Sequence, residues 1–312
     1  MLDWRAPCLS GFHAPLVIAG RLDYLIKESK GHATQPWRPA VLRPELRARY
    51  ARDGGGSRLC GGGKARHVVR VTVLGSGDAF GSGGRLHSAY LVETPRHTFL
   101  LDCGPTILQS LKRNGRDPGA VDFVLLSHLH GDHFGGLPFL FMEYRFEEPR
   151  TRPLAVYGPP GTERRVRALF GALYERIASE PLPFAVCYEE LVAGKSPALD
   201  GVRVLPFAVP HTRELQAFGY RIEVDGRTIL YSGDSAWTDE FVALSRGADL
   251  FLCECSTYET RVDIHISYPE IAARARDLGC RRLVLSHLGS EPLGHLGELT
   301  LECARDGMTL DL

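Results

Sequence analysis

The sequence predicts an α/β protein in which sheets are covered by helices on their outer faces. Three observations carry this prediction. The composition is that of an ordinary globular protein, since 44% of the 312 residues are hydrophobic and 24% are charged. Short β-branched and apolar runs dominate the chain just after residue 67. Further along, strand-like and helix-like segments alternate, which is typical of sheets flanked by helices.

The expected elements follow from residue periodicity and turn signals. Strands are expected at 68–74, 89–93, 98–101 and 121–126, and helices at 105–113, 137–146 and 162–178. Strands are then expected at 202–209, 218–224, 228–231 and 250–254, followed by a helix at 268–278 and a strand at 282–285. Pro269 lies in the first turn of the helix expected at 268–278, where proline is tolerated.

The first 66 residues differ in composition from the remainder. They contain twelve Lys and Arg residues against five Asp and Glu, and glycine clusters at 54–56 and 61–63. Neither helical nor strand periodicity persists there. We therefore expect a basic, Gly- and Pro-rich N-terminal extension over residues 1–66, poorly ordered, and a folded domain over residues 67–312. A basic nucleic-acid-binding arm, or a translation start nearer residue 67, are the alternatives for the extension.

The charge and hydrophobicity of residues 67–312 limit the kinds of partner that this domain can bind. It holds 25 Lys and Arg residues against 32 Asp and Glu, which weighs against a large polyanion. No apolar run approaches the roughly 20 residues that span a bilayer, so no membrane partner is expected. No secretory signal is recognisable, which makes the cytoplasm the expected location. Cys253 and Cys255 are interpreted as buried strand positions with reduced thiols.

A cluster of histidines and a carboxylate follows the strand expected at 121–126. It is the segment Ser127-His128-Leu129-His130-Gly131-Asp132-His133. Imidazole and carboxylate groups are ligands that Zn²⁺, Fe and Mn²⁺ accept. Alternation along a strand would aim His128 and His130 at one metal. The chain must then turn to bring Asp132 and His133 to a second metal, and we expect the glycines at 131, 135 and 136 to supply the backbone freedom for that turn.

This H-x-H-x-D-H segment resembles the metallo-β-lactamase superfamily, and the resemblance covers about residues 68–290. The family's further elements occur in order after expected strands, namely Asp102, His211, Asp234 and His287. The resemblance implies a four-layer αββα sandwich with two mixed β-sheets. It also implies a metal-dependent hydrolase.

The resemblance further implies a binuclear centre with two divalent ions, zinc by preference and manganese or iron otherwise. The first metal would be bound by His128, His130 and His211. The second would be bound by Asp132, His133 and His287, with Asp234 bridging both metals. Asp132 would also be a catalytic residue. A metal-bridging hydroxide would be the nucleophile, since two metals lower the pKa of a shared water. Asp102 is expected to orient a ligand histidine, the alternative being a turn aspartate before Gly104.

One further histidine, His265, lies 22 residues before His287 and just ahead of the helix expected at 268–278. The sequence here resembles ribonuclease Z and the cyclic phosphodiesterase of the carbon–phosphorus lyase pathway, which have an extra histidine before that helix. The resemblance implies that His265 assists the phosphoryl group or protonates the leaving group. A histidine that merely precedes the helix is the alternative. Glu254 is the candidate acidic partner of His265.

The glycine-rich loop at 75–78 fits the same branch, because its backbone N–H groups could approach an anionic ester. His87 is interpreted as a surface loop histidine. The sequence therefore predicts a phosphodiesterase for a small phosphodiester or similar ester. Thioester or lactone hydrolysis, as in glyoxalase II, and tRNA 3′-end cleavage, as in ribonuclease Z, are the alternatives. Cleavage of tRNA is less favoured because residues 157–161 lead directly into a helix, with no long arm. A homodimer is a family-level expectation.

Overall fold

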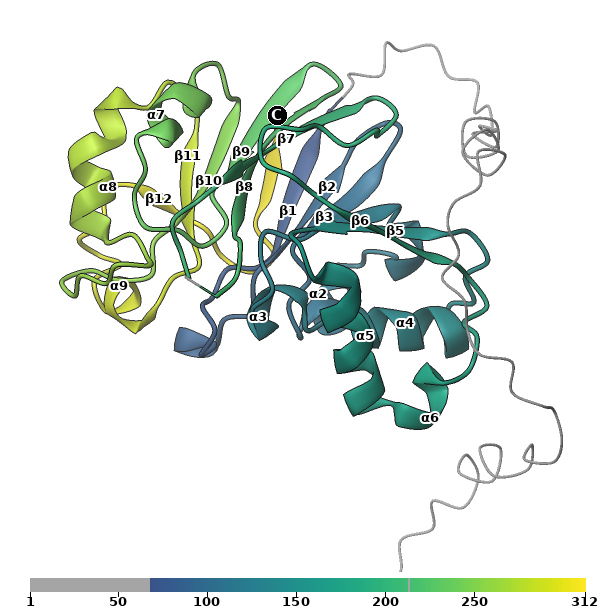
Figure 1. The fold of residues 1–312 in the computed structure, drawn as a ribbon. Helices are drawn as coiled ribbons and strands as arrows, with labels where there is room; N and C mark the ends of the chain where they lie inside the picture. Colours follow the sequence, from purple (N-terminus) through teal and green to yellow (C-terminus); the bar gives the residue numbers. More distant parts are fainter. Residues whose placement is uncertain (1–67, 213) are drawn as a thin grey trace, which may run out of the picture. The chain divides into compact units, whose positions relative to one another are not determined.

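The computed structural model describes residues 68–212 and 214–312. The extension predicted at 1–66 lies outside these residues, so the domain boundary stays a prediction. Among the described residues, the strands form two mixed sheets (Figure 1). No described helix is both long enough and apolar enough to cross a bilayer.

The first sheet has seven strands. Their order across the sheet is β13 (Thr309–Asp311), β1 (Arg70–Gly75), β2 (Ala89–Glu93), β3 (Thr98–Leu101), β4 (Phe123–Leu125), β5 (Leu154–Gly158) and β6 (Val186–Glu190). Neighbours are antiparallel from β13 to β3 and parallel from β3 to β6.

The second sheet has six strands. Their order is β12 (Glu302–Cys303), β11 (Leu283–Ser286), β10 (Leu250–Glu254), β9 (Arg227–Tyr231), β8 (Phe218–Val224) and β7 (Val202–Ala208). Strands β9 to β12 are mutually parallel, whereas β8 is antiparallel to both of its neighbours. Strand β7 therefore runs in the same direction as β9, β10 and β11.

Helices cover the outer face of each sheet (Figure 1). The seven-stranded sheet is covered by α2 (Ile107–Arg113), α4 (Leu137–Phe146) and α5 (Thr162–Leu173), and the six-stranded sheet by α7 (Glu240–Ser245) and α8 (Tyr268–Arg274). Shorter helical segments are η2 (Ser82–Gly84), η3 (Pro118–Ala120), α3 (Gly131–Phe134), α6 (Glu175–Ala178), η4 (Ala275–Asp277) and α9 (Ser290–Gly294). The four-layer αββα prediction is confirmed.

Alternation along the strands builds the layers. In β3, Phe99 and Leu101 lie in the core between the two sheets, whereas Leu100 packs against the helices. In β8, Tyr220 and Ile222 likewise face the core between the sheets. Side chains of a strand point alternately to opposite faces, so both faces of a covered sheet must be apolar. This explains why the strands read as nearly continuous apolar runs.

Two of the expected helices need correction, and some elements were not predicted. The helix expected at 162–178 is broken at Tyr174, whose φ of −140° and ψ of 56° are not helical. The ring of Tyr174 contacts Phe139 and Phe170 at this break. The helix expected at 268–278 ends as α8 at Arg274 and continues as the short segment η4. Strands β5, β6, β12 and β13 and helix α7 were not predicted, although β5 lies inside the sheet between β4 and β6.

Candidate metal centre

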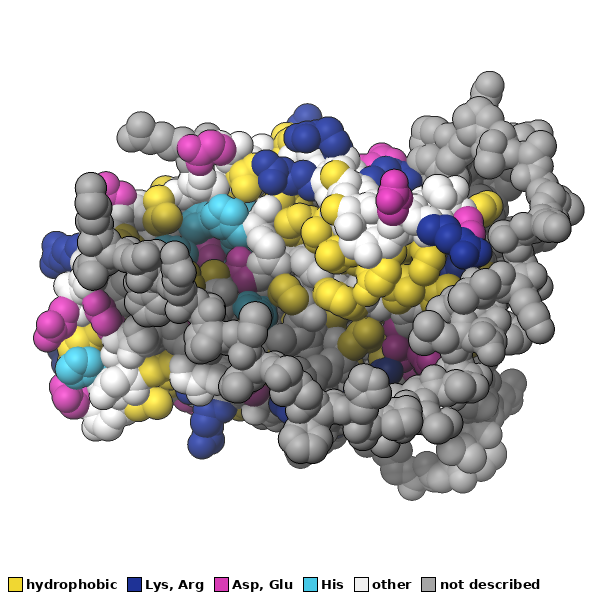
Figure 2. Space-filling model, turned by 90° about the horizontal axis from the view of Figure 1, so that it is seen from below, with side chains coloured by type: hydrophobic (Ala, Val, Ile, Leu, Met, Phe, Trp, Pro, Cys, Tyr) yellow, Lys and Arg dark blue, Asp and Glu magenta, His cyan; other side chains and the backbone are white. Residues whose placement is uncertain are grey.

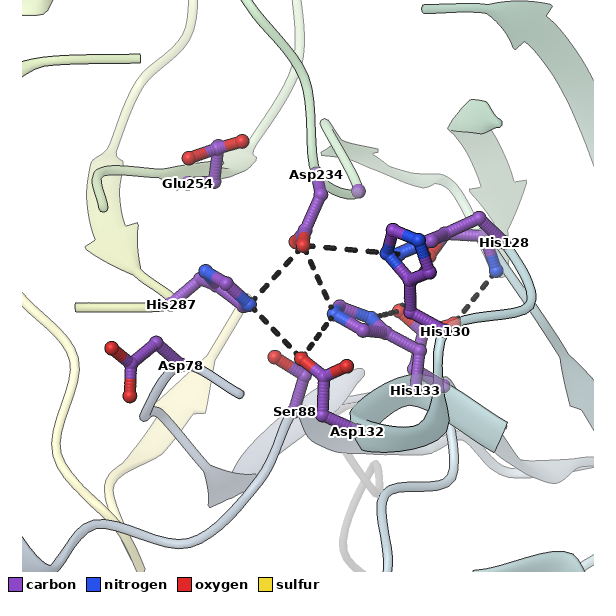
Figure 3. A network of polar contacts seen from close by, with 12 residues as sticks. Asp78, Ser88, His128, His130, Asp132, His133, Asp234, Glu254 and His287 are labelled. Carbon is purple, nitrogen blue, oxygen red and sulfur yellow. Dashed lines mark hydrogen bonds and ion pairs between the residues drawn. The ribbon is translucent and has the colours of Figure 1, made fainter. Parts of the chain in front are cut away.

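The candidate ligands follow the carboxyl ends of strands that run in one direction within each sheet. His128 follows β4, next to β3, which ends just before Asp102. In the other sheet, His211 follows β7, Asp234 follows β9 and His287 follows β11. The carboxyl ends of parallel strands share one edge of a sheet, so residues far apart in the sequence meet there. Figure 3 shows His128, Asp234 and His287 converging from both halves of the domain.

The first group of donors consists of three imidazoles. Nδ1 of His130 lies 3.1 Å from Nε2 of His128 and 3.1 Å from Nε2 of His211. Burial is the main cause that lowers the pKa of His128 and of His130, and neighbouring imidazoles lower both further. The rings of His128 and His130 are therefore neutral, and their lone pairs are available to a cation.

The second group of donors surrounds the carboxylates of Asp132 and Asp234. Oδ2 of Asp132 lies 3.2 Å from Nε2 of His133 and 3.3 Å from Nε2 of His287. Oδ2 of Asp234 lies 3.2 Å from each of the same two nitrogens. It is also 3.8 Å from Nε2 of His128, in the first group. Asp234 thus lies between the two groups (Figure 3), which is where a bridging ligand must be.

Glycines after the histidine cluster serve close packing. Gly135 and Gly136 have φ of −63° and −81°, values that any residue adopts. A Cβ at Gly136 would instead collide with the carbonyl oxygen of Gly104, and a Cβ at Gly135 with that of Gly131. Gly131 itself has open space around it. The expectation that these glycines supply backbone freedom is therefore wrong, since α3 turns the chain with ordinary helical geometry.

Asp102 connects two of the candidate ligands to one buried carboxylate. Its Oδ2 accepts the hydroxyl of Ser127 at 2.7 Å and lies 2.7 Å from Nδ1 of His133. Because the hydroxyl hydrogen of Ser127 points to Asp102, its oxygen accepts Nδ1–H of His128 at 3.0 Å. Both histidines then present the lone pair of Nε2 to the centre. This geometry supports the orienting role predicted for Asp102.

Glu254 occupies the equivalent place in the other half of the domain. Its Oε1 lies 2.9 Å from Nδ1 of His265, and its Oε2 accepts the hydroxyl of Ser256 at 2.8 Å. The oxygen of Ser256 in turn lies 2.9 Å from Nδ1 of His287. Each half thus contains a buried carboxylate that holds one histidine directly and another through a serine. The sequence-based reasoning missed both serines, although Ser127 directly precedes His128 and Ser256 lies two residues after Glu254.

Two buried polar atoms test whether the site fits metal ions. Oδ1 of Asp234 is buried and has no hydrogen-bond partner among the described residues. Nε2 of His133 is buried between two carboxylates at 3.2 Å, without a hydrogen bond of good geometry to either. Burying such groups without a partner costs free energy, and a bound cation would remove that cost. Nitrogen and carboxylate oxygen donors without thiolates fit zinc, iron and manganese alike. The residues present therefore fit divalent metal ions.

The charges of the second group make metal affinity depend on pH. Burial alone would lower the pKa of His287, but Asp234 and Asp132 raise it to about 9. In protein stripped with a chelator, His287 is therefore protonated at neutral pH, and a cation must displace that proton. Burial opposes it, but Asp234, Asp132 and Asp102 also raise the pKa of His133, so a cation must displace a proton there too. We expect the apparent zinc affinity to rise at least tenfold per pH unit from about pH 7 to 9. Competition with a chromophoric chelator at each pH measures this, and an affinity that is flat over that range would contradict it.

Replacing Asp102 by asparagine is expected to weaken metal binding about 10- to 100-fold. The amide nitrogen cannot accept the hydrogen bonds that Asp102 receives from Ser127 and His133, so both candidate ligands lose their orientation. The matched control is Asp306→Asn, because Asp306 accepts hydrogen bonds from Ser76 but contacts no candidate ligand. Thermal melting separates unfolding from loss of metal. Equal zinc affinities in the two variants would refute the orienting role.

A cavity of about 430 Å³ opens beside the two groups of donors. Figure 2 shows histidine and acidic side chains gathered on this face. His265 lines the cavity. One of its ring nitrogens lies within 4.8 Å of potential metal-binding atoms of His211 and Asp234. Burial alone would lower the pKa of His265, but the carboxylate of Glu254 outweighs it and raises the pKa. The protonated form of this imidazole at the cavity wall is therefore favoured.

Two other expectations are wrong. His87 is not a surface loop histidine, because it is partly buried and its Nδ1 is buried without a hydrogen-bond partner among the described residues. The glycine-rich loop does not offer a ligand the N–H groups of Ser76 and Gly77. Those of Ser76 and Gly77 bond to Asp306 and Leu86. Cys253 and Cys255 are buried as expected.

Known proteins resemble this chain in sequence and in fold. The model of a family described as the beta-lactamase superfamily domain matches residues 97–288. Uncharacterized protein Rv1339 of Mycobacterium tuberculosis is 37% identical over 228 residues, which cover 70% of this chain and 81% of the relative. Ribonuclease Z of Mycobacterium tuberculosis is 31% identical over 240 residues, covering 70% and 85%. The metallo-β-lactamase fold protein YhfI from Bacillus subtilis superposes with a TM-score of 0.63 at 21% identity, covering 79% of this chain and 100% of its own.

Proposed function

Because the chain belongs to the metallo-β-lactamase superfamily, we propose that it is a binuclear metal-dependent phosphodiesterase. The family and the relatives make it a metal-dependent hydrolase. The observation that carries the finer proposal is His265, which Glu254 holds at the wall of the cavity beside the candidate metal ligands. The 31% identity to a ribonuclease, an enzyme that cleaves phosphodiester bonds, supports the same reaction class.

The two groups of donors would hold two divalent cations. His128, His130 and His211 would bind one, Asp132, His133 and His287 the other, and Asp234 both. When bound, the cations supply Lewis-acid activation of water and compensate the charge of a phosphoryl group. The chain's own contribution is orientation: Asp102 and Glu254, with Ser127 and Ser256, would fix which nitrogen of His128, His133 and His287 faces the centre.

His265 would act as the proton donor. Glu254 accepts its Nδ1–H, so Nε2–H is left to donate to a phosphoryl oxygen or to the departing alkoxide. An alkoxide is a strong base and needs that proton, whereas a thiolate leaves without one because a thiol has a pKa of about 8.5. A histidine held in this way therefore favours phosphodiester hydrolysis over thioester hydrolysis.

Cleavage of the 3′ end of tRNA is a second candidate, favoured by the identity to ribonuclease Z. Two features weigh against it. Strand β5 ends at Gly158 and α5 begins at Thr162, which leaves no space for a substrate-binding arm at that place. The cavity of about 430 Å³ also suits a small molecule.

The test is a comparison of substrates on zinc- and manganese-loaded protein. Bis-p-nitrophenyl phosphate, a thioester, a lactone and a tRNA precursor are each assayed with the wild-type chain and with Asp234→Ala. We expect turnover of the phosphodiester that the substitution removes. Turnover of the thioester or lactone without the phosphodiester would overturn the proposal, and turnover of the tRNA precursor alone would favour the second candidate.

A further inference from the structure

Three exposed apolar side chains line the same cavity as the candidate metal ligands. Phe80 is 90% exposed, Ile264 40% and Val262 37%. All three border the cavity, together with His265 and Asp234. Single exposed apolar residues are common, but a group of three around one cavity offers a ligand apolar surface to bury.

The exposure of Phe80 is fixed by the turn that carries it. Oδ1 of Asp78 accepts the N–H of Phe80 at 3.2 Å and that of Ser82 at 2.9 Å. Oδ2 of Asp78 accepts the hydroxyl of Ser82 at 2.8 Å. Asp78 itself is buried, so the turn is anchored to the domain. The backbone of Phe80 is therefore held beside the cavity before any ligand binds, which lowers the entropy cost of contact.

The charge of the cavity limits which charged groups a ligand can carry beside its apolar part. Within the described residues, the lining contains four carboxylates and no Lys or Arg, the carboxylates being Asp78, Asp132, Asp234 and Glu291. The hydroxyl and backbone N–H of Thr260, with the N–H of Tyr258, lower the pKa of Glu291 to about 2. Glu291 therefore stays negative at neutral pH and repels a second anionic group beside the metal centre.

We propose that this cavity selects small phosphodiesters whose non-reacting substituent is uncharged and apolar or aromatic, and that Phe80, Val262 and Ile264 contact that substituent. The inference rests on the proposed function, because the metal centre would locate the phosphoryl group. Asp132 and Asp234 would be occupied by the cations, so Asp78 and Glu291 are the lining carboxylates that would disfavour a second anionic group. These three side chains form the exposed rim of the cavity. The substrate specificity would arise from this rim, not from the groups that perform the chemistry.

Binding calorimetry on the zinc-loaded full chain tests the proposal without turnover. The ligands are dimethylphosphinate and methyl(phenyl)phosphinate, which carry one negative charge each, resist hydrolysis and differ by one phenyl group. We expect the phenyl compound to bind about tenfold more tightly, because its ring is buried at the rim. Methyl(4-carboxyphenyl)phosphinate should lose that advantage through its remote charge.

Variants of Phe80 assign the preference to the rim. Phe80→Ala is expected to reduce the phenyl preference to less than about threefold, whereas Phe80→Tyr keeps the ring and the preference. The control is Phe146→Ala, since Phe146 is 47% exposed on α4 and does not line the cavity. A phenyl preference that survives in Phe80→Ala, or equal affinities in the wild type, would overturn the inference.

The proposed function and this inference fail in different ways. If neither phosphinate binds although bis-p-nitrophenyl phosphate is hydrolysed, the inference is wrong and the proposed function stands. If the chain hydrolyses only thioesters or lactones, the proposed function fails, whatever the phosphinates do. A tighter binding of the carboxyphenyl compound than of the phenyl compound would also contradict the inference.

Discussion

Replacing Asp234 with alanine is expected to abolish hydrolysis and to lower bound metal together. Oδ2 of Asp234 is within 3.8 Å of nitrogens from both groups of donors, so its loss affects both cations. It also removes one of the two carboxylates that lie between His133 and His287, the other being that of Asp132. We expect a loss of at least about three orders of magnitude in kcat/KM, since the metals supply most of the chemistry. Metal content is measured by mass spectrometry on the same samples.

The control for this variant is Asp239→Ala, five residues further along the chain. Asp239 is exposed and accepts a hydrogen bond from Trp237, away from the candidate ligands. This variant should keep both metal and activity. Activity that persists in Asp234→Ala with normal metal content would show that Asp234 does not bridge the centre.

His265→Ala is expected to keep the metal content and to lower kcat about 10²- to 10⁴-fold. The loss should be largest for esters with alkoxide leaving groups and smallest for p-nitrophenyl esters, because nitrophenolate leaves without protonation. His265 is held by Glu254 and is not needed to complete either group of donors. Rates on a series of esters with leaving groups of graded pKa measure the effect.

The matched control is His97→Ala, since His97 follows β2 and does not line the cavity. Equal losses on activated and unactivated esters would argue against proton donation by His265. A loss of metal from His265→Ala would instead identify it as a ligand. The structure allows this test to discriminate, because a donor atom of His265 lies within 4.8 Å of donor atoms on Glu254 and His287.

Much of the fold could be predicted because local signals agree with tertiary structure. Strands β2, β3, β8 and β10 have the bounds that alternation and turn residues indicate. The candidate ligands could be anticipated because each follows a strand, and strand ends are where parallel sheets gather side chains. The structure brings all seven predicted ligands together, and it also brings Asp102 and Glu254 to the histidines that they were expected to hold.

The remaining features depend on contacts between distant residues. Strand β5 was missed because Pro153 and the prolines after Gly158 mask a five-residue run whose partners lie in β4 and β6. Ser256 gains its role only when β10 and β11 pair, which brings it to His287. The glycines at 135 and 136 are required by the backbone of Gly104 and Gly131, which no local pattern reveals.

The central claim is that hydrolysis by this chain requires two cations in the two groups of donors. The most direct test is to strip the protein with a chelator and to add zinc stepwise, measuring bound metal and bis-p-nitrophenyl phosphate hydrolysis on the same samples. We predict no hydrolysis in stripped protein and a rate that reaches its maximum when about two equivalents per chain are bound. Undiminished hydrolysis in the stripped protein, or a rate that is already maximal with about one zinc bound per chain, would contradict the account.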